Sequence, residues 1–139
     1  MKLMRITAQS GEDLRRFYDV QGWETKNERW RKPITAMLEL LDYLELEVDF
    51  PPQWVLTSHA NLVFVGADDY RERLVTICPL GECTSGPRTS RFEIHRPLEA
   101  PWSDAVGYAP SVQSAWKMIE SVLCFAPVPH RDAQRGFRA

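Results

Sequence analysis

The strongest pattern in the chain is a run of apolar residues at helical spacing between Pro33 and the pair Pro51–Pro52. Apolar residues that recur every three or four positions lie on one side of an α-helix, and proline is well tolerated in the first helical turn. Two consecutive prolines end a helix. We therefore predict that this segment is the longest buried helix of the protein, with these residues on its inner face: Ile34, Met37, Leu38, Leu41, Leu44 and Val48.

A block of four short strands follows the long helix. Each candidate strand is rich in β-branched or aromatic residues and is bounded by turn residues, which is typical of β-structure. The last one alternates apolar and polar side chains, so one of its faces is expected to be in water. The four predicted strands cover residues 53–58, 62–66, 73–78 and 90–96.

Two further helices and two connecting segments complete the pattern. Ser10 is suited to an N-cap and Gly22 to a C-terminal stop, which predicts a short first helix between them. Ser111 is suited to cap an amphipathic helix that follows it. Residues 23–32 are expected to form a polar connector, and residues 97–110, with three prolines and a glycine, an irregular loop.

The order of these elements predicts an α+β fold, with helix, helix, four strands and helix in sequence. We expect a single four-stranded antiparallel sheet with the helices packed mainly on one face, in the order α-α-β-β-β-β-α. A length of 139 residues fits one domain. That domain is predicted to cover residues 1–126, and residues 127–139, which are rich in arginine and proline, are predicted to be a disordered basic tail.

The N-terminal residues and the cysteines favour a cytoplasmic location. The first 17 residues carry charges throughout and lack the apolar core of a signal peptide. The three cysteines, Cys78, Cys83 and Cys124, are an odd number, which is more typical of reduced thiols than of a disulfide framework. We therefore expect a cytoplasmic protein without cofactors.

The charges are unevenly distributed along the chain. Residues 33–70 contain no lysine or arginine but seven acidic residues. Glu39, Asp42 and Glu45 lie three positions apart on the long helix, where like charges repel one another. Either basic residues of the connector neutralise them internally (Lys26, Arg29, Arg31 and Lys32), or a basic partner protein binds them. On the second interpretation, the candidate partner-binding residues are Glu39, Asp42, Tyr43, Glu45, Glu47 and Asp49.

In size and in this acidic segment, the chain resembles bacterial immunity proteins, which block a basic toxin with an acidic surface. The resemblance is one of size and charge, so no residue roles are carried over from that family. It implies a non-enzymatic binding protein, an immunity-type inhibitor that captures a basic protein partner through an acidic helix face. Tyr43 would serve as an aromatic anchor in this surface, because tyrosine is frequent among residues that dominate binding energy.

Nucleic-acid binding is a first alternative, based on the aromatic and basic residues of the connector. Tryptophans with cationic neighbours can stack the bases of single strands and hold their phosphates. The structural interpretation of the same residues is that the tryptophans fix the connector to the core while the arginines reach water. The candidate nucleic-acid residues are Trp23, Lys26, Arg29, Trp30 and Arg31.

A small enzyme is a second alternative, in which His59 and His95 act together with a cysteine. Cys78 or Cys83 would be the nucleophile, although neither precedes a predicted helix whose N-terminus would lower a thiol pKa. The chain has no Gly-x-Ser-x-Gly motif for a serine nucleophile. The four-residue spacing of Cys78 and Cys83 differs from that of a zinc knuckle, so no metal site is predicted.

Overall fold

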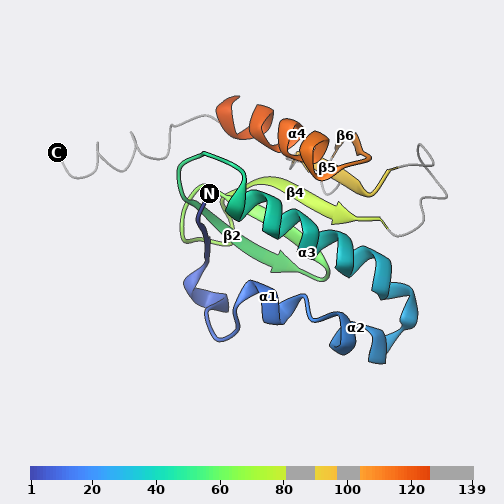
Figure 1. Ribbon diagram of the computed structural model, residues 1–139. Coiled ribbons are helices and arrows are strands. Elements are labelled where there is room, and N and C mark those ends of the chain that lie inside the picture. The colour runs from blue at the N-terminus through green and yellow to red at the C-terminus, as the bar shows by residue number, and fades with distance from the viewer. Residues whose placement is uncertain (81–89, 97–103, 126–139) are drawn as a thin grey trace.

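The computed structural model describes residues 1–80, 90–96 and 104–125 (Figure 1). The predicted tail at residues 127–139 lies outside the described residues. The α+β class agrees with the prediction from the sequence. In chain order the elements are β1 (Leu3–Arg5), the 3₁₀ turn η1 (Thr7–Gln9), α1 (Leu14–Phe17), α2 (Val20–Lys26), the 3₁₀ turn η2 (Glu28–Trp30), α3 (Arg31–Leu46), β2 (Gln53–Ser58), β3 (Asn61–Val65), β4 (Arg73–Pro79), β5 (Phe92–Arg96), β6 (Asp104–Ala109) and α4 (Val112–Phe125).

The strands form one six-stranded mixed sheet in the order β1-β2-β3-β4-β5-β6. β1 runs parallel to β2, and every other neighbouring pair is antiparallel. The prediction of a four-stranded antiparallel sheet, in the order α-α-β-β-β-β-α, is therefore wrong. The four predicted strands correspond to β2, β3, β4 and β5, and the two missed strands lie at the two ends of the sheet.

Each missed strand has a physical reason. β1 is only three residues long, too short to show a period of two, and it pairs with residues about 50 positions later, with Leu3 opposite Gln53. β6 contains Gly107 and lies between prolines, a composition that favours a loop. A Cβ atom on Gly107 would come within 3.2 Å of the Met118 side chain, so the glycine allows α4 to lie close to this strand.

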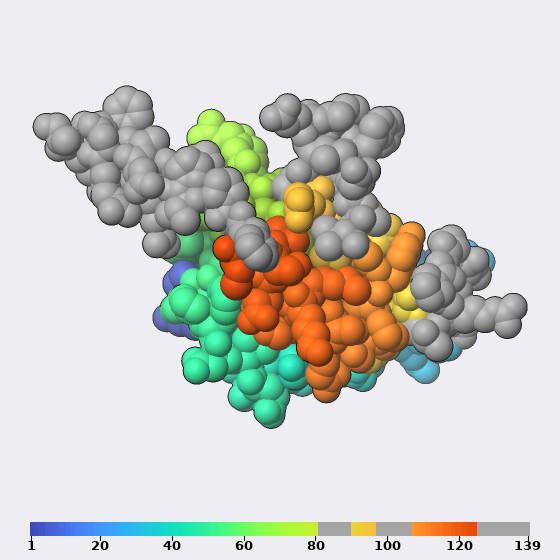
Figure 2. All heavy atoms as spheres, turned by 90° about the horizontal axis from the view of Figure 1, so that it is seen from above, coloured from blue at the N-terminus to red at the C-terminus, as the bar shows by residue number. Residues whose placement is uncertain are grey.

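Helices α3 and α4 cover one face of the sheet, as Figure 1 shows. Seen from above in Figure 2, α4 lies across the molecule beside the end of α3. The predicted burial of one side of the long helix is confirmed for Ile34, Met37, Leu41 and Leu44, whereas Leu38 is half-buried and the buried Val48 lies beyond the end of α3. The buried residues of α3 are Pro33, Ile34, Ala36, Met37, Leu40, Leu41 and Leu44. They pack against side chains of the central strands, among them Phe64, Ile77 and Ile94. Each large apolar side chain buried there contributes about 1.5–3 kcal/mol.

The opposite face of the sheet carries a second, smaller apolar cluster. Ile6, Leu56, Val63 and Val65 are buried in it, and the half-buried Trp54 packs against them. Because successive side chains of a strand point to opposite faces, β2 and β3 contribute to both clusters. Both strands are therefore apolar on two sides, which explains why residues 62–65 of β3 are all apolar.

The N-terminal helix differs from the prediction. Asp13 is the N-cap, accepting a hydrogen bond from the backbone N–H of Arg16 at 2.9 Å, and α1 ends already at Phe17. Asp19 then caps α2, which continues through Gly22 to Lys26. The predicted helix between Ser10 and Gly22 is thus two short helices that begin and end elsewhere. The buried Tyr18 at the break anchors this segment, since its hydroxyl donates to the carbonyl oxygen of Ala60 at 3.0 Å.

The ends of α3 and α4 are stabilised in different ways. The amino group of Met1 donates to the carbonyl oxygens of Leu44 at 2.9 Å and Val48 at 2.6 Å, which places a positive charge at the C-terminal end of α3 (Figure 1). At α4, the hydroxyl of Ser111 accepts a hydrogen bond from the N–H of Ser114 at 3.1 Å. The predicted capping role of Ser111 is confirmed.

Candidate functional site

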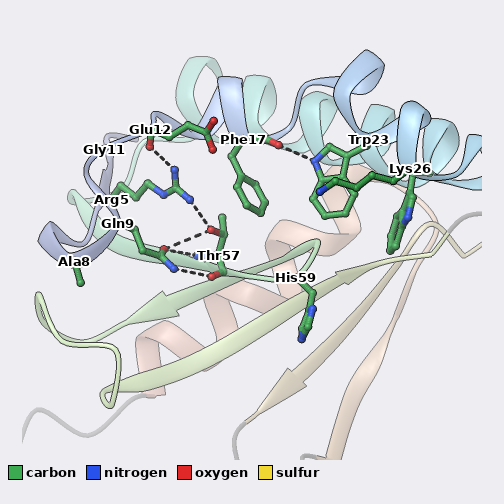
Figure 3. Close-up of a pocket in the computed structure, with 11 residues that line it drawn as sticks. Arg5, Ala8, Gln9, Gly11, Glu12, Phe17, Trp23, Lys26, Thr57 and His59 are labelled. Atoms are coloured by element: carbon green, nitrogen blue, oxygen red, sulfur yellow. Dashed lines mark hydrogen bonds between the residues drawn. The ribbon is translucent and has the colours of Figure 1, made fainter.

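An open groove of about 660 Å³ lies between the N-terminal helices and the β2–β3 hairpin (Figure 3). We call it the aromatic groove. It collects residues that are far apart in the sequence, from β1, η1, α1, α2, η2, β2 and the hairpin turn. Its lining residues are Arg5, Ala8, Gln9, Gly11, Glu12, Phe17, Trp23, Lys26, Trp30, Thr57 and His59.

Three aromatic side chains line the groove in a row. The rings of Phe17 and Trp23 lie 5.7 Å apart between centroids, and those of Trp23 and Trp30 lie 4.9 Å apart, both edge to face. The indole N–H of Trp23 donates to the carbonyl oxygen of Phe17 at 2.7 Å. All three rings are half-buried and pack against the main core, so the row is fixed in place while part of each ring stays accessible.

Arg5 brings a positive charge to one end of this row. Its guanidinium lies 5.1 Å from the centroid of the Phe17 ring, donates to the hydroxyl of Thr57 at 2.6 Å and also donates to the carbonyl oxygen of Glu12. Its Nε is buried without a hydrogen-bond partner. Within the described residues no carboxylate pairs with Arg5, so this half-buried charge has only neutral neighbours in contact.

Gln9 hydrogen-bonds to the edge of strand β2 beside Arg5. Its side-chain amide donates to the carbonyl oxygen of Thr57 at 2.8 Å and accepts from the N–H of Thr57 at 2.8 Å, as a neighbouring strand would. β1 ends at Arg5, so Gln9 satisfies the backbone groups of β2 beyond that point. Both polar atoms of the Gln9 amide are therefore occupied within the protein.

Lys26 and His59 are the other basic residues that line the groove. The ammonium group of Lys26 lies 4.7 Å from the centroid of the Trp23 ring. His59 adopts a φ of 55° in the β2–β3 turn, and Figure 3 shows its ring pointing away from Phe17 and Trp23. Neither residue has an ion-pair partner among the residues that the structure describes.

Sequence reasoning found only part of this site. Trp23, Lys26 and Trp30 line the groove, whereas Arg29 and Arg31 lie outside it. Arg31 instead forms an ion pair with Glu24, and this hydrogen bond lowers the pKa of the Glu24 carboxyl. Arg5, Gln9 and Thr57 were missed, and no local pattern could have indicated them, because they join the site through the pairing of β1 with β2.

The acidic side of α3 is already paired with arginines. Glu39 lies 2.7 Å from Arg91, Asp42 lies 2.6 Å from Arg15, and Glu45 lies 3.5 Å from the same Arg15. Internal neutralisation of these three carboxylates therefore occurs through Arg15 and Arg91, whereas Lys26, Arg29 and Arg31, which were expected to supply it, form none of these pairs. All three pairs are at least one-third exposed, so each is worth little in water.

The C-terminal end of α3 differs from its middle. Leu46 is 77% exposed, and the neighbouring carboxylates of Glu47 and Asp49 have no ion-pair partner among the described residues. Tyr43 is half-buried and packs against the core. Of the predicted partner-binding residues, only Glu47 and Asp49 thus remain as charges with no ion pair to the part of the chain that the structure describes.

His59 does not join the other predicted enzymatic residues, whereas Cys78 and His95 lie on the neighbouring strands β4 and β5. His59 lies in the β2–β3 turn, whereas His95 lies on β5 with its Nε2 3.0 Å from a carboxylate oxygen of Glu93. Cys78 is opposite Glu93 in the β4–β5 pair, and burial, with a smaller contribution from Glu93, raises the pKa of its thiol to about 11. A thiol with this pKa stays protonated at neutral pH, which does not favour nucleophilic catalysis. Cys83 lies outside the described residues.

Three further observations complete the description. Among residues 1–80, 90–96 and 104–125, no group of three or more His, Cys, Asp or Glu side chains converges as metal ligands. Within the same part of the chain, no helix has the length and apolar character to cross a bilayer.

No protein-family model, no curated protein and no solved structure matches this chain.

Proposed function

We propose that this chain is a non-enzymatic binding module that holds a negatively charged ligand in the aromatic groove. The observation that carries the proposal is that neither Arg5 nor Lys26 has a carboxylate partner among the described residues. Both contact only neutral groups, whereas Arg15, Arg31 and Arg91 are all paired with carboxylates. A half-buried guanidinium without a counter-ion pays a desolvation cost that an anionic ligand would offset.

Glu12 also lines the groove and sets a condition on the ligand. Its carboxylate has no ion-pair partner among the described residues, and it repels an anion bound beside Arg5. We therefore expect Glu12→Gln to tighten the binding of an anion. An increase in affinity is informative because a merely damaged protein does not bind more tightly.

The test measures the binding of inorganic tripolyphosphate by isothermal titration calorimetry at low ionic strength. Arg5→Gln is expected to weaken binding about tenfold or more, since a charge-assisted contact is lost. The exposed Lys26→Gln provides a second variant if Arg5→Gln fails to fold. Arg15→Gln is the matched control, because it removes an equal charge outside the groove. Absence of binding, or equal loss in the control, would contradict the proposal.

A second candidate function, the capture of a basic protein partner, is supported by the end of α3. There Leu46 is exposed between acidic residues, and Glu47 and Asp49 are unpaired among the described residues. An apolar contact surrounded by free carboxylates suits a basic surface. In affinity capture from a native lysate with mass spectrometry, the double variant Glu47→Lys, Asp49→Lys should lose basic proteins that Glu39→Gln retains. A captured set that both variants leave unchanged would exclude this function.

A further inference from the structure

The groove combines two positive charges with a row of three aromatic rings. From one end of the groove, Arg5 lies against Phe17, Phe17 lies against Trp23, and Trp23 lies against Trp30. Lys26 lies over the Trp23 ring. Figure 3 shows Arg5 and Lys26 at separate positions along the groove, with Phe17 between them. The ligand that complements such a groove carries both negative charges and flat rings.

This combination of charges and rings distinguishes between anionic ligands. A polyphosphate would use the two cations and leave the rings without a partner. A single nucleotide would need one cation and one ring, whereas the row offers two cations and three rings. Single-stranded nucleic acid repeats phosphate and base along its length, and its unpaired bases can stack on aromatic side chains. A duplex keeps its base faces stacked inside and cannot use the rings.

We infer that the ligand of the aromatic groove is a short single-stranded nucleic acid, whose phosphates bind Arg5 and Lys26 and whose bases stack on the aromatic row. The inference rests on the proposed function and names the class of its ligand. Binding is expected to depend little on base sequence. The Gln9 amide, a side chain suited to reading base edges, is occupied by the backbone of Thr57.

The experiment measures fluorescence anisotropy of a labelled hexathymidylate at low salt, with tripolyphosphate and a blunt-ended DNA duplex as competitors. The single strand should bind about tenfold more tightly than tripolyphosphate, because stacking adds to the charge contacts. Trp30→Leu should weaken the single strand by about fivefold or more and leave tripolyphosphate unchanged. Trp30→Phe, which keeps a ring, should restore most of the affinity.

Charge variants complete the design. Lys26→Gln should weaken both the single strand and tripolyphosphate, whereas Lys117→Gln, an exposed lysine on α4, should weaken neither. Circular dichroism and thermal melting confirm that each variant is folded. These controls separate a contact in the groove from a general effect of net charge.

The outcomes distinguish the inference from the proposed function. If tripolyphosphate binds with the expected dependence on Arg5 but the single strand binds no more tightly, the proposed function stands and this inference is overturned. Equal binding of the duplex, or single-strand binding that ignores Trp30 and Lys26, overturns it as well. If neither probe binds, both the inference and the proposed function fail.

Discussion

On the acidic side of α3, the charges have partners within the protein, whereas in the aromatic groove they do not. Asp42 and Glu45 both lie within 3.5 Å of Arg15, but Arg5 and Lys26 contact only carbonyl, hydroxyl and aromatic groups. The acidic segment is much the more conspicuous of the two in the sequence. Clustering of like charge along a chain therefore says little about which surface is left to bind a ligand, because tertiary contacts decide which charges are already paired.

The largest expected effect comes from a substitution in the core that supports both α3 and the aromatic groove. Leu41 is fully buried on α3 and belongs to the same core against which Phe17, Trp23 and Trp30 pack. Leu41→Ala should lower the free energy of unfolding by about 2–5 kcal/mol, measured by urea denaturation.

The matched control for that variant lies on the same helix. Leu46 is 77% exposed, so Leu46→Ala should stay within about 0.5 kcal/mol of the wild type. Similar losses of unfolding free energy in Leu41→Ala and Leu46→Ala would show that the two faces of α3 do not differ in burial.

A smaller effect is expected at Tyr18, whose ring lies 4.9 Å from that of Phe17 between centroids. Tyr18→Phe removes the hydroxyl that donates to the buried carbonyl of Ala60, and an unsatisfied buried acceptor costs about 1–3 kcal/mol. Urea denaturation measures the loss, and amide hydrogen exchange should show it in the hairpin that carries Ala60. Tyr70→Phe, at a tyrosine that is 60% exposed, is the control and should be neutral. If both variants are neutral, the hydroxyl of Tyr18 does not anchor this segment.

The acidic surface should respond weakly and in a salt-dependent way. Arg15→Gln removes the partner of Asp42 and Glu45, and pairs this exposed are worth about 0.2–1 kcal/mol. The loss should disappear in about 1 M NaCl, where exposed charges are screened. Arg16→Gln is the control, since that side chain is 82% exposed with one contact at 3.8 Å. A loss that persists in high salt would mean that Arg15 acts through packing.

The smallest effect concerns pH, at the pair of Arg31 and Glu24 beside the groove. Arg31 holds the pKa of the Glu24 carboxyl below its ordinary value. A folded-state pKa that is lowered adds stability above the unfolded pKa, and this stability is lost as the pH falls through the folded value. The Tm difference between wild type and Arg31→Gln should therefore be present at neutral pH and vanish in acid.

The neighbouring arginine provides the control for this pH dependence. Arg29 is exposed and has no ion pair among the described residues, so Arg29→Gln should show no Tm difference that changes with pH. A difference for Arg31→Gln that stays constant into acid would contradict the assigned role of the pair.

Part of the groove could be predicted from the sequence, and the reason lies in the range of the contacts. Trp23, Lys26 and Trp30 lie within eight positions of one another, so their proximity is a local property of the chain. Arg5 and Thr57 are 52 positions apart and meet only because β1 pairs with β2. Spacing along a chain carries no information about such a contact.

The sequence by itself determined the long helix, its buried face, the four central strands and the α+β class, because periodicity records which side of an element leaves water. Only the tertiary structure decided the edge strands β1 and β6, the arginine partners of the acidic residues and the assembly of the aromatic groove. These features depend on which distant segments pack together, as Arg91 does with Glu39. Whether a charge is paired or left available to a ligand is therefore a property of the folded protein.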